Sequence, residues 1–204
     1  ANRIKLGDKM SVEEAYQLAA DCARAAGAPY IAGDIGPTGS LLEPMGTLSF
    51  DEAYDIFAEQ VRAAVAAGCD IILVETMADL REAKAALLAA RENSTLPVFV
   101  TMTFGEDGRT FLGTTPEIAA EVLSSLGAQA VGLNCSLGPA ELTGAARAMA
   151  SRVRCPLMAQ PNAGLPHMEN GETVFDVGPN EFAQAMEAIL DAGATVVGGC
   201  CGTT

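Results

Sequence analysis

The sequence has few basic residues, few aromatic residues and no tryptophan. Its 12 lysines and arginines stand against 26 acidic residues, which gives the 204-residue chain a net charge of −14. Such an acidic surface repels phosphate backbones and anionic lipid headgroups, so we expect neither nucleic acid nor a membrane as a partner. Aromatic residues make up only 5% of the chain while half of it is hydrophobic. This composition favours helices packed closely on a buried sheet.

Long apolar runs and a disulfide framework are also missing. The chain contains no stretch of about 18 consecutive apolar residues, and its start lacks a basic segment followed by an apolar one, so we expect neither a membrane span nor export. The six cysteines lack the regular spacing of a secreted disulfide scaffold, and a chain of this length can bury a core without cross-links. The sequence therefore favours a reducing, cytoplasmic location.

What the chain does contain is a repeated alternation of helical and apolar patterns. Capping residues followed by apolar positions at helical spacing predict helices over 11–26, 49–67, 79–92, 116–126, 139–152 and 179–191. Short apolar runs predict buried strands over 28–35, 70–75, 98–104, 130–133, 156–160 and 195–197. Unbroken alternation indicates parallel strands joined by right-handed crossovers, and thus a single α/β domain over 1–204.

The positions of the polar residues favour a closed barrel over an open sheet. Six such residues fall at or just past the C-terminal end of a predicted strand, namely Asp34, Glu75, Thr103, Asn134, Gln160 and Cys200. In a (β/α)8 TIM-type barrel these ends meet at one mouth, where barrel enzymes hold their active sites. Closure takes eight strands, but only about six can be recognised, and no helix follows the last one. We therefore expect an incomplete barrel that lacks the first strands and the last helix.

The most informative stretch is the end of the chain, where Cys200 and Cys201 lie among glycines after an apolar run. Adjacent cysteines rarely pair with each other, but two neighbouring thiolates can bind a metal such as zinc. Cys135 follows another predicted strand in the segment VGLNCS and can supply a third sulfur. Three thiolates leave the fourth position of a tetrahedral zinc open, as in catalytic sites. The alternative is that all three are small buried hydrophobic residues.

Three thiolates place negative charge on a metal, which makes it a weak activator of water and favours a substrate thiol as the fourth ligand. Zinc hydrolases use histidine and carboxylate ligands, whereas the single histidine here, His167, lies in a predicted loop. A zinc-bound thiol is deprotonated and can attack an electrophilic carbon, most simply a methyl group. The cysteine pattern therefore predicts zinc-dependent transfer of a carbon group to a thiol.

Four further residues are candidates for binding the rest of the substrate. Glu75 ends the apolar run DIILVE and can receive an ammonium group or form a buried ion pair. Asn134 can orient the substrate or donate to a ligand sulfur. Asn162, in the loop PNAG, can offer an amide group or act as a turn former. Asp34 lies in GDIGPTG, which can bind an anion but is more typical of a tight turn.

The segments VGLNCS, PNAGLP and GGCCGTT together resemble the homocysteine-binding barrel of the zinc-dependent homocysteine S-methyltransferases. GDIGPTG and DIILVET are similar to that family too, so the resemblance covers essentially the whole chain. It implies that Cys135, Cys200 and Cys201 bind zinc and that Glu75 binds the ammonium of homocysteine. Family members begin with a strand whose Asp-Gly loop helps to hold the substrate carboxylate, and no such segment precedes Ala1.

Within the family, PNAGLP together with GGCCGTT is most similar to the homocysteine-binding module of the cobalamin-dependent methionine synthases. This likeness implies that methylcobalamin on another module is the methyl donor and that a methyltetrahydrofolate-binding module regenerates it. The product from homocysteine would then be methionine.

Other readings remain open from the sequence. One is a thiol methyltransferase that uses betaine, S-methylmethionine or a methylated corrinoid protein. Another is a non-catalytic barrel in which a structural zinc clamps the last strand. A phosphate-binding barrel that uses the glycines of VVGG is a further alternative.

Overall fold

The computed structural model describes residues 1–169 and 171–203. The chain forms two compact units, Ala1–Val100 and Thr101–Thr204. Six parallel strands alternate with helices, in the sheet order β1-β2-β3-β4-β5-β8. The predicted α/β class is therefore confirmed, whereas a single domain over 1–204 stays a prediction. Within the described residues, no helix is long and apolar enough to cross a membrane.

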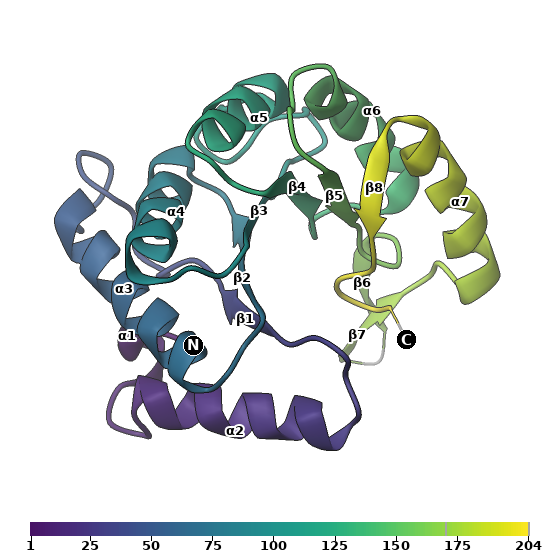
Figure 1. Ribbon diagram of the computed structural model, residues 1–204. Helices are drawn as coiled ribbons and strands as arrows, with labels where there is room; N and C mark the ends of the chain where they lie inside the picture. The colour runs from purple at the N-terminus through teal and green to yellow at the C-terminus, as the bar shows by residue number, and fades with distance from the viewer. Residues whose placement is uncertain (170, 204) are drawn as a thin grey trace. The chain divides into compact units, whose positions relative to one another are not determined.

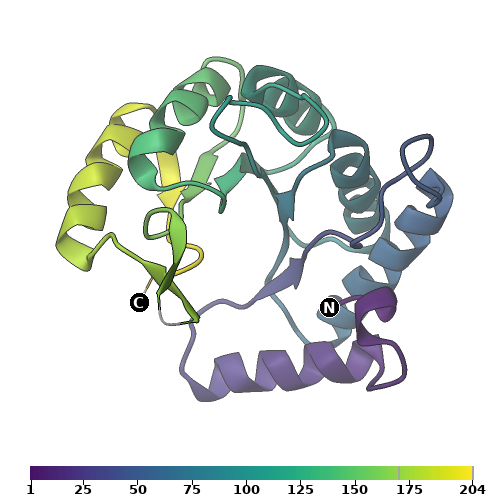
Figure 2. The same ribbon diagram turned by 180° about the vertical axis from the view of Figure 1, so that it is seen from behind.

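Unit 1 contains α1 (Arg3–Leu6), α2 (Val12–Ala25), β1 (Ala32–Ile35), α3 (Phe50–Ala66), β2 (Ile71–Met77) and α4 (Leu80–Asn93). β1 and β2 pair in parallel, and α3 and α4 lie along the outer side of these strands (Figure 1, Figure 2). The predicted helix starts are present, since Ser49 and Glu52 form a capping box on α3 and Ser11 caps α2. Fully buried alanines on α4 allow α3 to pack closely against it.

Unit 2 contains α5 (Pro116–Ser125), β4 (Ala130–Asn134), α6 (Pro139–Ala150), β5 (Leu157–Gln160), α7 (Pro179–Asp191) and β8 (Ala194–Val197), and β3 (Val98–Met102) crosses its boundary. β4, β5 and β8 pair in parallel, with α5, α6 and α7 outside them (Figure 1). Gly132 lies where a side chain would come within 1.9 Å of the backbone oxygen of Met158. The close approach of β4 and β5 therefore requires glycine at this position.

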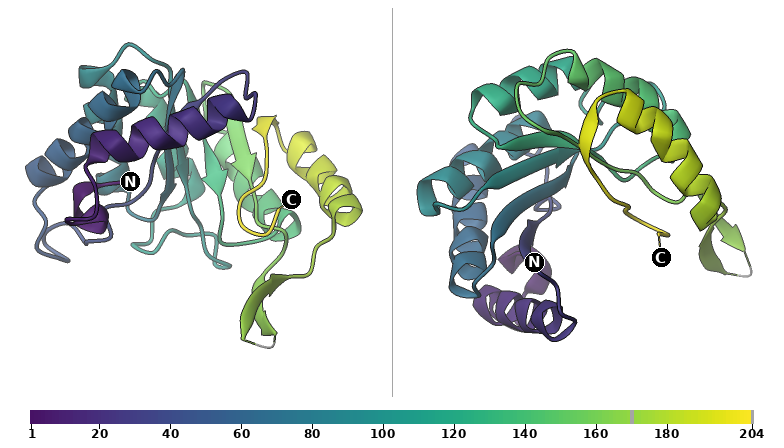
Figure 3. Two further views of the ribbon diagram at one scale, coloured as in Figure 1. Left: turned by 90° about the horizontal axis from the view of Figure 1, so that it is seen from below. Right: turned by 45° about the vertical axis from the view of Figure 1, so that its right-hand side comes forward.

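Three local predictions differ from the structure. Residues 166–175, expected as part of a loop, contain an antiparallel hairpin of β6 (Pro166–Glu169) and β7 (Glu172–Phe175), which extends away from the other strands of unit 2 (left panel of Figure 3). Most of its residues are exposed, so it lacks the apolar pattern on which strand prediction depends. The short helix α1 was not predicted either. Glu75 does not end its strand, because β2 continues to Met77.

Candidate functional site

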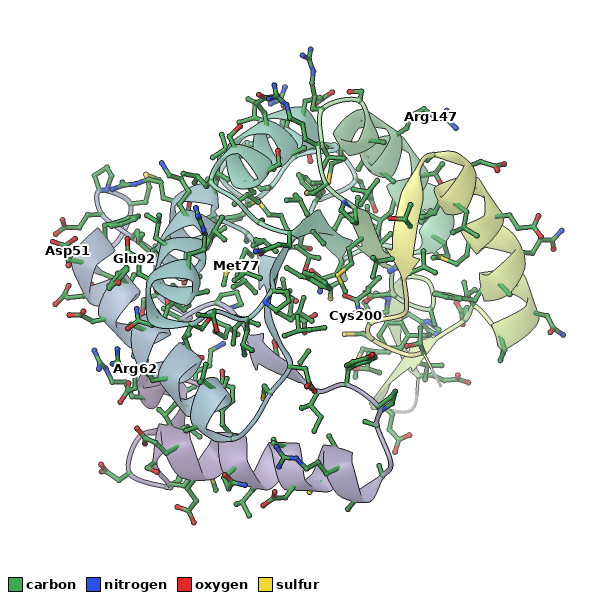
Figure 4. All side chains as sticks on the ribbon, in the orientation of Figure 1. Asp51, Arg62, Met77, Glu92, Arg147 and Cys200 are labelled. Atoms are coloured by element: carbon green, nitrogen blue, oxygen red, sulfur yellow. The ribbon has the colours of Figure 1, made fainter. Side chains whose placement is uncertain are left out.

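The sulfurs of Cys135, Cys200 and Cys201 come together in unit 2. Cys135 directly follows β4, the other two lie in the turn after β8, and the three Sγ atoms are within 4.8 Å of one another. Figure 4 labels Cys200 in that turn. The Sγ atom of Cys201 is 3.8 Å from that of Cys135 and 4.0 Å from that of Cys200. Zn–S bonds of about 2.3 Å in a tetrahedral site separate two sulfurs by about 3.8 Å. The sulfurs therefore have the spacing of zinc ligands.

The backbone at the end of β4 adopts an unusual conformation. Cys135 and Ser136 have φ angles of 62° and 64°, in the left-handed region that residues with side chains rarely adopt. Each such residue costs on the order of 1 kcal/mol or more, so the surrounding contacts must hold it. The N–H of Cys135 donates to the carbonyl of Gln160 at 3.0 Å, and the N–H of Leu137 donates to the carbonyl of Cys135 at 2.8 Å. Strain of this kind gathers at functional sites.

The loop after β5 holds the Cys200–Cys201 turn in place. The N–H of Cys200 donates to the carbonyl of Pro161 at 2.8 Å, and the N–H of Ala163 donates to the carbonyl of Cys201 at 2.9 Å. The buried side chain of Asn162 accepts the N–H of Cys201 through Oδ1 at 3.1 Å. These contacts give Asn162 a role that the sequence analysis did not anticipate, since it supports the backbone of a candidate metal ligand.

Asn134 joins the sulfur cluster to a residue that the sequence analysis missed. It is the last residue of β4, it is fully buried, and its Nδ2 lies 3.8 Å from the Sγ of Cys200. Its Oδ1 accepts a hydrogen bond from the hydroxyl of Thr101 at 2.7 Å. Thr101 lies in VFVTM, where a threonine satisfies strand propensity and draws no attention. The available signal was that a hydroxyl in such an apolar run needs a buried partner.

The electrostatics of the cluster favour a bound cation. Burial and the adjacent Cys135 raise the pKa of Cys200 to about 12, and the same two causes raise the pKa of Cys201. Protein groups alone therefore keep these two thiols protonated, whereas a metal ion would deprotonate them. Among the described residues, no fourth His, Cys, Asp or Glu joins the cluster. His167 lies on β6 instead, with its Nδ1 3.4 Å from a carboxylate oxygen of Asp176. The cluster thus has the chemistry of a soft metal site with three protein sulfurs.

Unit 1 contains a second cluster, made of two carboxyl groups. Asp34 on β1 and Glu75 on β2 are hydrogen-bonded to each other. Burial, together with the charge of Asp34, raises the pKa of Glu75 to about 7, and burial also raises the pKa of Asp34. Thr76, the next residue on β2, has a left-handed φ of 60°. Glu75 therefore keeps a proton up to about neutral pH beside Asp34, and a cation could take the place of that proton.

The GDIGPTG segment is fixed by a buried carboxylate. The backbone N–H and the hydroxyl of Thr38 donate to Oε1 of Glu82 at 2.8 and 2.6 Å. Thr38 is fully buried and Glu82 nearly so. Glu82 thus occupies both donors of Thr38 in this loop, so the structure favours the tight-turn interpretation over anion binding.

Comparison with known proteins places the chain in a family. The sequence model of the family described as "Homocysteine S-methyltransferase" matches residues 1–204. The methionine synthases of Mycobacterium leprae and Mycobacterium tuberculosis are each 36% identical to it over 181 residues. The match covers 86% of this chain and 15% of each relative, so the chain spans about 15% of the length of these curated relatives.

Crystal structures of the homocysteine methyltransferase MmuM from Escherichia coli share the fold. The oxidised form has a TM-score of 0.80 at 21% identity, over 100% of this chain and 73% of MmuM. The metallated form has a TM-score of 0.73 at 22% identity, over 95% of this chain and 66% of MmuM. These likenesses support the barrel-type α/β fold. With the match over its whole length, the chain belongs to the homocysteine S-methyltransferase family.

Proposed function

We propose that the chain binds zinc through Cys135, Cys200 and Cys201 and that it transfers a methyl group to the thiol of homocysteine, forming methionine. The observation that carries this proposal is the set of three sulfurs within 4.8 Å of one another, at the spacing of zinc ligands. Family membership, methionine synthase relatives and an MmuM structure in a metallated form support it.

The zinc ion and the two asparagines beside the sulfur cluster, Asn134 and Asn162, have distinct tasks in this proposal. Bound zinc would supply an open position that keeps the substrate sulfur as a thiolate at neutral pH. The amide of Asn134 donates to the sulfur of Cys200, and Asn162 holds the backbone of Cys201. The substrate sulfur attacks the methyl carbon in line, so that an S–C bond forms while the bond from methyl to donor breaks. The electron pair of that bond stays with the donor, and the cysteines are unchanged.

Glu75 is proposed to receive the ammonium group of homocysteine, with Asp34 as the second carboxylate of the pair. The proposal rests on their own surroundings in unit 1, where the half-buried Glu75 is hydrogen-bonded to the more exposed Asp34 and has a pKa raised to about 7. A substrate ammonium compensates the charge of both groups after the proton leaves. Asn162 remains a candidate for contact with the substrate as well, through the part of its amide that does not face Cys201.

The proposed methyl donor is methylcobalamin on a separate module, and methyltetrahydrofolate is proposed to regenerate it on another. The methionine synthase relatives, of which this chain matches 15%, support a multi-module arrangement. We also propose that residues 1–204 act as one barrel domain and that the protein works in a reducing cytoplasm, where the thiols stay available for metal.

The zinc content of the purified chain, followed by the zinc X-ray absorption edge with and without homocysteine, tests the proposal. We expect about one zinc per chain and an edge spectrum that changes when the substrate sulfur enters the coordination sphere. Homocysteine binding should also release protons, which calorimetry in buffers of different ionisation enthalpy measures. A zinc-free protein would overturn the proposal. A zinc edge spectrum that stays unchanged when homocysteine is added would favour a structural zinc instead.

The donor is tested separately with the full-length protein. Methylcobalamin, betaine and S-methylmethionine are each supplied with homocysteine, and methionine is measured. Methionine formed with methylcobalamin, but with neither betaine nor S-methylmethionine, supports the proposed donor. Methionine formed with betaine or S-methylmethionine would identify that compound as the donor instead.

A further inference from the structure

A continuous chain of two contacts joins β3 to the sulfur cluster of unit 2. The hydroxyl of Thr101 donates to Oδ1 of Asn134 at 2.7 Å, and Nδ2 of Asn134 lies 3.8 Å from the Sγ of Cys200. Thr101 and Asn134 are both fully buried. Water therefore does not compete for the hydrogen bond between Thr101 and Asn134, and the orientation of the buried amide depends on the protein groups around it.

The charge on Cys200 decides which end of the amide must face it. A thiol can donate its proton to an amide oxygen, but a thiolate has only lone pairs and needs the NH2 end. When Nδ2 faces the sulfur, Oδ1 faces Thr101, and Thr101 must then act as the donor. A valine at position 101 would take this donor away from Oδ1 and would weaken the preference for the productive orientation.

We propose that Thr101 is a positioning residue for the metal centre, because its hydroxyl holds the Asn134 amide with the NH2 group toward the sulfur of Cys200. The inference rests on the proposed zinc site and adds to it a residue that touches neither metal nor substrate. Partners that hold metal ligands typically contribute 10–100-fold to metal affinity. Since Thr101 acts through one intermediate side chain, we expect an effect near the low end, about tenfold.

The experiment compares full-length variants loaded with Co(II) in place of zinc, together with zinc affinity measured by competition with a chelator. Thr101→Val removes the hydroxyl and keeps the shape. Loss of the N–H···S contact raises the energy of the sulfur lone pair, so the sulfur-to-cobalt charge-transfer band should move to lower energy, and zinc affinity should fall about tenfold. Thr143→Val on α6 is the matched control, because it removes a hydroxyl that bonds only a helix carbonyl in the same unit.

A second pair of variants keeps the test valid if the valine variant does not fold. Thr101→Ser and Thr101→Ala both lack the methyl group and differ only in the hydroxyl. The serine variant should keep the wild-type band, and the alanine variant should show the shift. In an Asn134→Leu background the effect of losing the Thr101 hydroxyl should vanish, since Thr101 acts through the amide.

The outcomes separate this inference from the proposed function. If the wild-type chain binds neither zinc nor cobalt, the proposed function fails and the inference falls with it. If the wild type binds metal and the Thr101 variants match it in both band position and affinity, the proposed function stands and the role of Thr101 is overturned. A Thr101 effect that persists unchanged in the Asn134→Leu background would also overturn it.

Discussion

The two units each hold a cluster of acidic groups near the C-terminal ends of parallel strands, on the neighbouring strands β1 and β2 in unit 1 and after β4 and β8, on either side of β5, in unit 2. The clusters differ in what relieves the repulsion between their charged forms. In unit 1 the side chains of Asp34 and Glu75 are hydrogen-bonded, and the pKa of Glu75 is raised to about 7. In unit 2 the pKa of Cys200 is raised to about 12 by burial and by Cys135. The oxygen pair therefore changes its charge near physiological pH, whereas the sulfur cluster needs a metal to lose its protons. Hard oxygens suit an ammonium ion and soft sulfurs suit zinc.

Removing one of the three sulfurs should have the largest effect, because it should abolish zinc binding in unit 2. Cys201→Ala takes away the thiolate closest to Cys135, and two sulfurs do not hold zinc against a chelator. We expect the zinc content to fall from about one per chain to near zero, as measured by elemental analysis after gel filtration. Cys22→Ala is the control, because Cys22 is exposed on α2 and should leave zinc bound. Full zinc retention by Cys201→Ala would refute the three-sulfur site.

Removing the charge in unit 1 should weaken substrate binding without affecting the metal. A hydrogen bond to a charged group contributes about 1.5–3 kcal/mol, so Glu75→Gln should raise the KM for homocysteine roughly 10–100-fold with zinc content unchanged. In the wild type, the KM should fall as pH rises through about 7, because Glu75 must lose its proton to bind an ammonium.

A substrate analogue isolates this effect. 4-Mercaptobutyrate keeps the thiol and lacks the ammonium, so its KM should not depend on Glu75. If the pH dependence near 7 persists with this analogue, the carboxylate pair is not its origin.

Weakening the support of the cysteine turn should have a smaller effect on the metal than removing a sulfur. Asn162→Ala removes the acceptor for the N–H of Cys201, and we expect about a tenfold loss of zinc affinity in the absence of homocysteine. Competition with a chelator measures the change. An unchanged affinity would show that the backbone contacts of Pro161 and Ala163 are enough to hold the turn.

The smallest expected effect is the dependence of the free energy of unfolding on pH, which arises from Glu75 in unit 1. The folded chain keeps a proton on Glu75 up to a pH of about 7, above its ordinary pKa, so its folding is favoured at low pH. Stability from this group is complete below about pH 4.5 and is lost as pH rises through about 7, by roughly 1–2 kcal/mol because the side chain is only half-buried. Urea unfolding at pH 5 and pH 8 measures the loss. Glu75→Gln should abolish it and the exposed control Glu187→Gln should not.

The sequence predicted the regular parts of the fold because local signals determine them. Ser11 and Ser49 cap their helices as expected. The glycine-flanked cysteines after β8 and the Asn-Cys step at the end of β4 lie together in the folded chain. The hairpin of β6 and β7 escaped prediction because its exposed strands have no apolar alternation.

Interactions between side chains that are distant in sequence were not predictable in the same way. Thr101 resembles any strand threonine until Asn134 is seen beside it. Asp34 and Glu75 were each recognised as strand-end acids, but their mutual hydrogen bond depends on the pairing of β1 and β2. Single residues were therefore identified from local pattern, and their partners required the tertiary structure.

The ligands on β4 and after β8 also have a topological consequence. Cys135 and Cys201 are 66 residues apart. A zinc ion bound to both would cross-link the chain, as a disulfide does, and close a loop that contains β5, the hairpin and α7. Closing a loop of this length lowers the entropy of the unfolded chain by an amount equivalent to about 4 kcal/mol. If zinc binds as proposed, the second half of the chain should open more often in zinc-starved cells and be cleaved by proteases sooner, so that the lifetime of the protein would depend on the supply of zinc.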